Sequence, residues 1–208
     1  EETYEIFWAE RFIMARWLAG RGTVDQVKVR NACLVAPDLD LAYVSEEKNT
    51  FDALTQLGVT TGAPLQNRAE VKAVLADGGV QLLHVASHAS FNSENPERSP
   101  IVLADGELYP EELSASTTRG LRIDRPLVFF NACSAGRLGY GLTGLGGWAE
   151  KLVVAGRVGA FVGTLWEVND RLAATFAQHL YTRLFAGDTL GEALHAARDL
   201  LADASARL

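Results

Sequence analysis

Short apolar runs that alternate with amphipathic stretches constrain the fold of this sequence more than any other feature. Residues 26–35, 80–88 (VQLLHVASH), 125–133 (RPLVFFNAC) and 157–166 (RVGAFVGTLW) have the length and composition of strands, and residues 80–88 and 125–133 read as strands buried on both faces. Amphipathic segments such as residues 66–76 separate them or follow them. This alternation is typical of a mainly parallel sheet with helices on both faces, so the sequence predicts a three-layer α/β/α fold.

The composition fits one domain preceded by a helix. The chain has 208 residues, 48% of them hydrophobic, which is enough to bury a full core, and we expect a single domain over residues 25–208. Residues 1–24 are expected to form a helix, because apolar side chains recur there at helical spacing; they are Phe7, Trp8, Phe12, Ile13, Trp17 and Leu18. Such a stripe needs a partner surface, either the core of this domain or an upstream domain of a longer polypeptide.

Charge and cysteine usage point to a protein of a reducing compartment. The net charge of −7 and the pI of about 5.1 offer no basic face, so nucleic acid and membrane surfaces are not expected partners. No apolar run approaches the roughly 20 residues that span a bilayer. Only Cys33 and Cys133 are present, far apart in sequence, which favours reduced thiols and a cytoplasmic location over a disulfide framework.

Two of the predicted strands end in residues that can perform nucleophilic chemistry. His88 ends one run and Cys133 ends another. Because ligands and catalytic groups gather at the carboxyl ends of parallel strands, neighbouring strands would bring this imidazole and this thiol to one edge. A thiol needs such a base because the thiolate is its reactive form. We therefore predict a catalytic dyad of His88 and Cys133.

His84 is the other histidine of the same run, four positions before His88. On a strand, residues four apart lie about 13 Å from each other, so the two imidazoles cannot share a metal ion. We predict that His84 is a packed or hydrogen-bonded structural residue and that the site holds no metal.

A glycine motif competes with the thiol for the functional assignment. Gly139, Gly141 and Gly144 have the spacing of a dinucleotide-binding turn, and Glu167 lies near the place of the acidic residue that binds a ribose. However, too many residues separate the first glycine from the strand that ends near Asn131. Phosphate binding requires a tight turn directly after the strand. Residues 137–147 are instead predicted to be a flexible loop beside the substrate.

These motifs together resemble the CHAT family, caspase-like cysteine peptidases that in bacteria are often attached to TPR repeats or sensor domains. The resemblance rests on residues 82–88 (LLHVASH), 127–136 (LVFFNACSAG) and 144–170 (GLGGWAEKLVVAGRVGAFVGTLWEVND), and it extends over about residues 27–204. It implies a caspase/separase-type α/β/α fold, His88 as general base and acid, and Cys133 as nucleophile. It also implies protein substrates and control by a partner domain or an effector.

Six further residues are expected to bind the substrate: Ala89, Asn131, Gly136, Trp166, Glu167 and Asp170. Ala89 stands where the family usually has a glycine whose N–H helps to hold the oxyanion, and Gly136 would let backbone N–H groups converge there. Asn131 replaces the aspartate by which related metacaspases select basic side chains. Glu167 and Asp170 could supply a negative pocket instead, although Asp170 also fits a helix N-cap.

The leading functional hypothesis is a cysteine endopeptidase without a cofactor, latent until a sensor domain or partner activates it, in bacterial defence or cell death. Two alternatives remain open. One is a catalytically silent caspase-like interaction module, and the other is a dinucleotide-binding domain that uses Gly139 to Gly144. Labelling with a thiol-directed peptidyl electrophile distinguishes the first two, and nucleotide titration tests the third.

Overall fold

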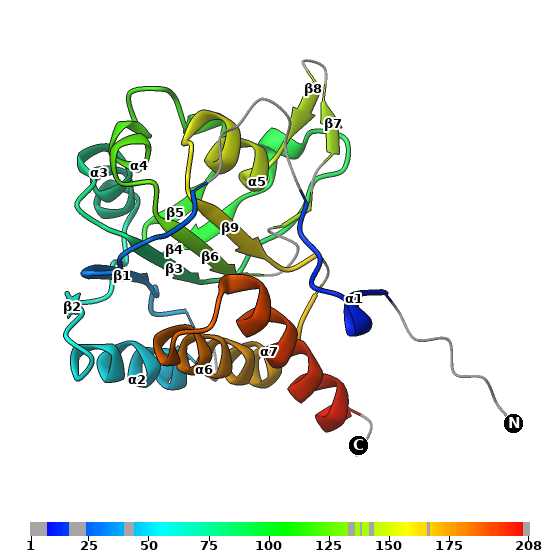
Figure 1. Cartoon of the computed structure of the whole chain (residues 1–208). Coiled ribbons are helices and arrows are strands. Elements are labelled where there is room, and N and C mark those ends of the chain that lie inside the picture. Colours follow the sequence, from blue (N-terminus) through cyan, green and yellow to red (C-terminus); the bar gives the residue numbers. More distant parts are fainter. Residues whose placement is uncertain are drawn as a thin grey trace, which may run out of the picture.

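The computed structural model describes residues 8–16, 24–39, 44–132, 136–137, 139–141, 144–165 and 167–205. They form three layers, with a β-sheet between two layers of helices (Figure 1). This arrangement, with its parallel central sheet, confirms the predicted fold class.

The central sheet has five parallel strands in the order β2-β1-β3-β6-β9. Their bounds are β1 Asn31–Val35, β2 Thr60–Thr61, β3 Leu82–Ala86, β6 Leu127–Asn131 and β9 Ala160–Gly163. Every residue of β3 is buried. A strand covered by helices on both faces needs apolar side chains on both, which explains why this run is continuous rather than alternating.

Three helices cover one face of the sheet, below it in Figure 1. They are α2 Val44–Thr55, α6 Asp170–Ala186 and α7 Leu190–Ser205. Phe51 of α2 and Leu180 of α6 are buried there with Phe129 of β6 and Leu82 of β3. This layer therefore shares one apolar core with the central strands.

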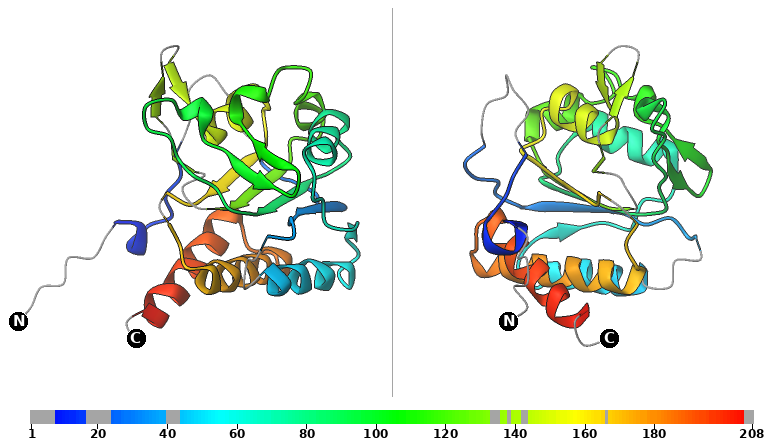
Figure 2. Two further views of the ribbon diagram at one scale, coloured as in Figure 1. Left: turned by 180° about the vertical axis from the view of Figure 1, so that it is seen from behind. Right: turned by 90° about the vertical axis from the view of Figure 1, so that its right-hand side faces the viewer.

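The opposite face carries shorter helices and two hairpins (Figure 2). The helices are α3 Arg68–Asp77, α4 Arg119–Asp124 and α5 Trp148–Glu150, which continues as the π-helix η3 Lys151–Ala155, with the 3₁₀ turns η1 Pro96–Arg98 and η2 Pro110–Glu112. The hairpins pair β4 Ile101–Leu103 with β5 Gly106–Leu108, and β7 Gly139–Gly141 with β8 Gly144–Gly146. Val71, Leu121 and Leu152 bury the helices of this layer against the sheet.

The amino-terminal segment differs from its prediction. A helix was expected over residues 1–24, but α1 covers only Trp8–Arg11, and Trp8, Phe12 and Ile13 are more than half exposed. A helix in a protein derives most of its stability from packing its apolar face, and helical spacing alone does not supply that packing. The α1 turn contacts α7, whereas Phe7, Trp17 and Leu18 lie outside the described residues.

The ends of the long helices follow their local sequence. Helix α6 begins after Asn169, whose side chain accepts a hydrogen bond from the Arg171 N–H, and it ends at Gly187 in the left-handed conformation. The cap is thus Asn169, and Asp170 is the first helical residue. No helix in the described part of the chain combines the length and the apolar character needed to cross a bilayer.

Candidate active site

The ends of β3 and β6 meet at one edge of the sheet, as the sequence predicts. The two strands are adjacent and parallel, and their last paired residues are Ala86 and Asn131. His88 follows Ala86 by two positions, and Cys133 follows Asn131 by the same two positions. His88 and Cys133 therefore follow paired strand residues at the same sequence distance. Cys133 itself lies outside the described residues.

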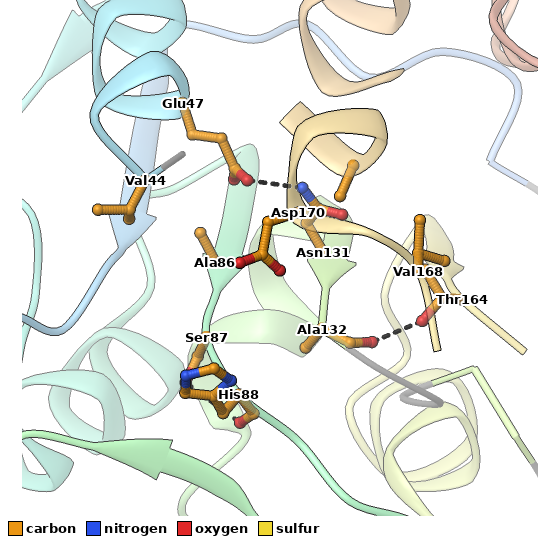
Figure 3. A pocket seen from close by; sticks show the side chains of 11 residues that line it. Val44, Glu47, Ala86, Ser87, His88, Asn131, Ala132, Thr164, Val168 and Asp170 are labelled. Carbon is orange, nitrogen blue, oxygen red and sulfur yellow. Dashed lines mark hydrogen bonds between the residues drawn. The ribbon is translucent and has the colours of Figure 1, made fainter. Parts of the chain in front are cut away.

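A pocket opens at this edge, and three of the predicted site residues line it: His88, Asn131 and Asp170 (Figure 3). The other lining residues are Val44, Glu47, Ala86, Ser87, Ala132, Thr164, Val168 and Ala173. Ala132 directly precedes Cys133. The pocket thus joins the end of β3, the end of β6 and the first turns of α2 and α6.

The segment that carries His88 is fixed to strand β4. The Val102 N–H donates to the His88 carbonyl at 2.9 Å, the Ser90 N–H donates to the Pro100 carbonyl at 3.2 Å, and the Ser87 hydroxyl bonds to the Val102 carbonyl. The imidazole of His88 is exposed at the pocket. The backbone is therefore held firmly while the ring remains accessible.

Ala89 lies within this ladder, opposite Ile101. The two backbone hydrogen bonds that flank the pair use the N–H groups of Ser90 and Val102, so neither engages the N–H of Ala89. Alanine in place of the expected glycine thus leaves this N–H free of the β4 ladder.

Gly136 has a packing role that sequence reasoning did not anticipate. Its N–H donates to the Thr164 carbonyl at 2.8 Å, and a Cβ at this position would lie only 2.6 Å from the Gly163 carbonyl oxygen. The Thr164 hydroxyl in turn donates to the Ala132 carbonyl at 2.6 Å. The N–H of Gly136 is therefore committed to Thr164, just beyond β9, and the expectation that Gly136 lets other backbone N–H groups converge on an oxyanion stays a prediction.

Of the two acidic residues after β9, only Asp170 lines the pocket. Asp170 lines the pocket from the first turn of α6, where a helix N-terminus favours a negative charge. Glu167 is exposed and does not line the pocket, and Trp166 lies outside the described residues.

A buried polar chain under the pocket was missed as a functional element. His84 of β3 is fully buried; its Nδ1 lies 2.7 Å from the Tyr181 hydroxyl and its Nε2 lies 2.5 Å from Glu47 Oε2. The other oxygen of Glu47, Oε1, accepts a hydrogen bond from Asn131 Nδ2 at 2.7 Å. This buried chain of hydrogen bonds therefore connects α6, β3 and α2 to the end of β6.

The prediction that His84 is a hydrogen-bonded structural residue agrees with these contacts. A local signal also marked Glu47, since it is spaced from Phe51 and Leu54 as residues of one helix face are, and all three are buried. Tyr181 gave no such signal, because its partner lies 97 positions away.

Burial fixes the protonation of Tyr181. It raises the pKa of the Tyr181 hydroxyl well above its ordinary value, and the carboxylate of Glu47 raises it further. The rings of Phe51 and Phe129 enclose the imidazole of His84 edge-on, at centroid distances of 5.5 and 4.9 Å. The hydroxyl of Tyr181 therefore stays protonated and able to donate a hydrogen bond in this apolar setting.

The glycine motif forms a hairpin rather than a phosphate-binding turn. Strands β7 and β8 pair antiparallel, and a Cβ on Gly139 would lie 2.7 Å from the side chain of Pro96 and 3.2 Å from that of Phe91. Arg137 stacks over the same Phe91 ring at 4.5 Å. The described part of the predicted loop is thus a hairpin packed on η1. Gly139 does not open a helix, so the dinucleotide alternative loses its structural basis.

Metal binding has no candidate cluster in the ranges that the structure covers, since no three of their His, Cys, Asp and Glu side chains converge. The same sheet edge instead gathers an imidazole, an amide and carboxylates. This combination suits proton transfer and hydrogen bonding to an organic substrate.

A parallel sheet between two helical layers, with His88 and the residue before Cys133 at one pocket, is consistent with a caspase-like class of domain. A family model described as the CHAT domain matches residues 23–207, which is most of the chain. The chain therefore belongs to the CHAT domain family. No curated protein matches the chain.

Proposed function

We propose that this chain is a cysteine endopeptidase domain that cleaves protein substrates with His88 and Cys133. The shared register of β3 and β6 carries the proposal, because it makes His88 and Cys133 equivalent positions beyond two paired strands. The exposed imidazole of His88 and the position of Ala132 at the same pocket support it. Membership of a caspase-like family agrees with this chemistry.

The proposed reaction has two halves. His88 removes the proton from Cys133, the thiolate attacks the carbonyl carbon of the peptide bond, and the imidazolium protonates the amine as the C–N bond breaks. This leaves a thioester, which a water molecule hydrolyses after giving its proton to His88. The acid product leaves, and the thiol of Cys133 is regenerated.

Residues around the pocket have distinct proposed roles in binding. The N–H of Ala89, which the β4 ladder does not use, would donate to the oxyanion. Asn131 and Asp170, which line the pocket, would contact a substrate side chain. Trp166 and Glu167 remain predictions for the outer wall of this site.

Regulation from outside the domain forms part of the same proposal. The enzyme would act in the cytoplasm and stay latent until a sensor domain or partner shifts it to the active state, in bacterial defence or cell death. Cleavage of a matched substrate by this chain alone, and by a longer protein with and without its effector, tests latency. Equal and constitutive turnover in all three cases would contradict it.

Labelling with a peptidyl electrophile that alkylates thiols tests the dyad. We expect adduct formation on Cys133, no cleavage by Cys133→Ala, and kcat lowered about a hundredfold to ten-thousandfold by His88→Ala. Cys33→Ala is the matched control and should retain full activity. Efficient proteolysis by Cys133→Ala would refute the mechanism, and a chain that neither labels nor cleaves would favour the silent interaction module.

A further inference from the structure

The Asn131 amide is held in one orientation by Glu47. Its Nδ2 lies 2.7 Å from Glu47 Oε1, and an amide is planar, so its oxygen lies on the other side of the group (Figure 3). Asn131 is only half-buried and lines the pocket, whereas Glu47 is buried. The buried carboxyl thus determines which end of the amide remains available.

This orientation does not depend on the protonation of Glu47. If the carboxyl is ionised, both oxygens accept hydrogen bonds. If it is protonated on Oε2, that oxygen can donate to His84 Nε2 at 2.5 Å, and Oε1 is still an acceptor. In both cases Asn131 must turn its NH₂ group toward Glu47.

We propose that Glu47 is a positioning residue that presents the amide oxygen of Asn131, rather than its NH₂ group, to the substrate. Together with the carboxylate of Asp170, this oxygen gives the pocket hydrogen-bond acceptors at its inner wall. The pocket therefore discriminates in favour of substrate side chains that donate hydrogen bonds. The orientation stands on geometry alone, while the preference among substrates rests on the proposed peptidase function.

The substitution Glu47→Gln distinguishes the positioning of the Asn131 amide from a purely structural role of Glu47. The side-chain oxygen of the introduced glutamine can still accept from His84 Nε2–H, and its NH₂ group must then face Asn131. The amide of Asn131 is expected to invert, so that its oxygen accepts from the new NH₂ group and its own NH₂ enters the pocket. Every hydrogen bond of the buried polar chain is kept. Only the group of Asn131 that faces the substrate changes, from an acceptor oxygen to a donor NH₂.

Solvent exchange of the Asn131 side-chain amide tests the orientation by NMR on the full 208-residue chain. The resonance is assigned by its loss in Asn131→Asp. In the unmodified chain the proton bonded to Glu47 should exchange about tenfold or more slowly than in Glu47→Gln. The variant Tyr181→Phe leaves Glu47 and Asn131 intact and should retain slow exchange.

Fast exchange in the unmodified chain would overturn the proposal by itself, whether or not Glu47→Gln folds. Unchanged protection in a folded Glu47→Gln chain would overturn it as well. Neither result depends on activity, so the orientation is tested even if no peptide is cleaved.

The consequence for specificity is tested with two peptides that differ only in Gln or Glu before the scissile bond. Glu47→Gln should lower the ratio of kcat/KM for Gln over Glu by about tenfold or more. Glu46→Gln removes an equal charge from an exposed neighbour on α2 that does not line the pocket, and it should change the ratio less. An equal change in both variants would show that charge alone sets the preference. Absence of cleavage in all variants would instead count against the proposed function.

Discussion

Removing the hydroxyl of Tyr181 tests most directly how much the buried chain of hydrogen bonds stabilises the fold. In Tyr181→Phe the ring remains among Phe51 and Phe129, so no large cavity forms. The Nδ1 of His84, which lies 2.7 Å from the lost hydroxyl and is fully buried, is left without a partner. An unsatisfied buried group of this kind costs about 1–3 kcal/mol of unfolding free energy.

Chemical denaturation and thermal unfolding at pH 7 measure this loss. For a domain of this size, each kcal/mol lowers the midpoint of thermal unfolding by roughly 2–4 °C. Tyr109→Phe is the matched control, since the hydroxyl of Tyr109 bonds to Glu107 at the surface, and its removal should leave the midpoint unchanged. A Tyr181→Phe chain as stable as this control would refute the reasoning.

The same variant has a signature at alkaline pH. The pKa of Tyr181 is raised above its ordinary value of 10.0 in the folded protein, so above that pH the unfolded chain loses a proton that the folded chain keeps. Unfolding is then favoured as the pH rises, by about 1.4 kcal/mol per pH unit. Tyr181→Phe lacks this contribution. The difference in unfolding free energy between the unmodified chain and Tyr181→Phe should therefore become smaller above pH 10. A constant deficit would contradict the assignment.

The remaining predictions concern packing and thiol reactivity. Burial raises the pKa of Cys33 from 9.0 to about 11, so in a Cys133→Ala chain at pH 8 iodoacetamide should modify Cys33 about 100-fold more slowly than an unperturbed thiol. A rate equal to that of free cysteine would contradict this. Gly120→Ala places a Cβ against the backbone of Gly78 and should lower the free energy of unfolding by about 1–3 kcal/mol. Gly62→Ala meets open space and should be neutral or raise it by up to about 1 kcal/mol; equal effects in the two glycine variants would argue against the close contact.

The sheet was predictable because burial on both faces leaves a strong mark on sequence. Strands β3 and β6, which are almost entirely buried, fall inside the apolar runs from which they were predicted. Strand β9 also falls inside its run, although its residues are only half-buried. The helix expected over residues 1–24 was wrong beyond α1 within the described residues, since spacing indicates a face but not what covers it. The β7–β8 hairpin was missed because its glycines serve contacts with Pro96 and Phe91, which no local pattern encodes.

The sequence points to candidate site residues where they stand at strand ends, and it misses contacts that depend on distant partners. His88 and Asn131 follow directly from the ends of β3 and β6. The contact between Glu47 and Asn131 joins residues 84 positions apart, and that between His84 and Tyr181 joins residues 97 apart. Only the packing of α2 and α6 on one face of the sheet creates these contacts.

The pocket is built from α2, β3, β6 and α6, which are synthesised at different times. It can therefore be completed only late in the synthesis of the chain. Glu47 and His88 leave the ribosome early, whereas Asp170 and Tyr181 arrive only with α6. Parallel strand pairs and other contacts between distant residues form late in folding, because a long loop must first be closed. A nascent or truncated chain that lacks α6 therefore has neither the complete pocket nor the hydrogen bond between Tyr181 and His84. The pocket is complete only after nearly all of the domain has been made.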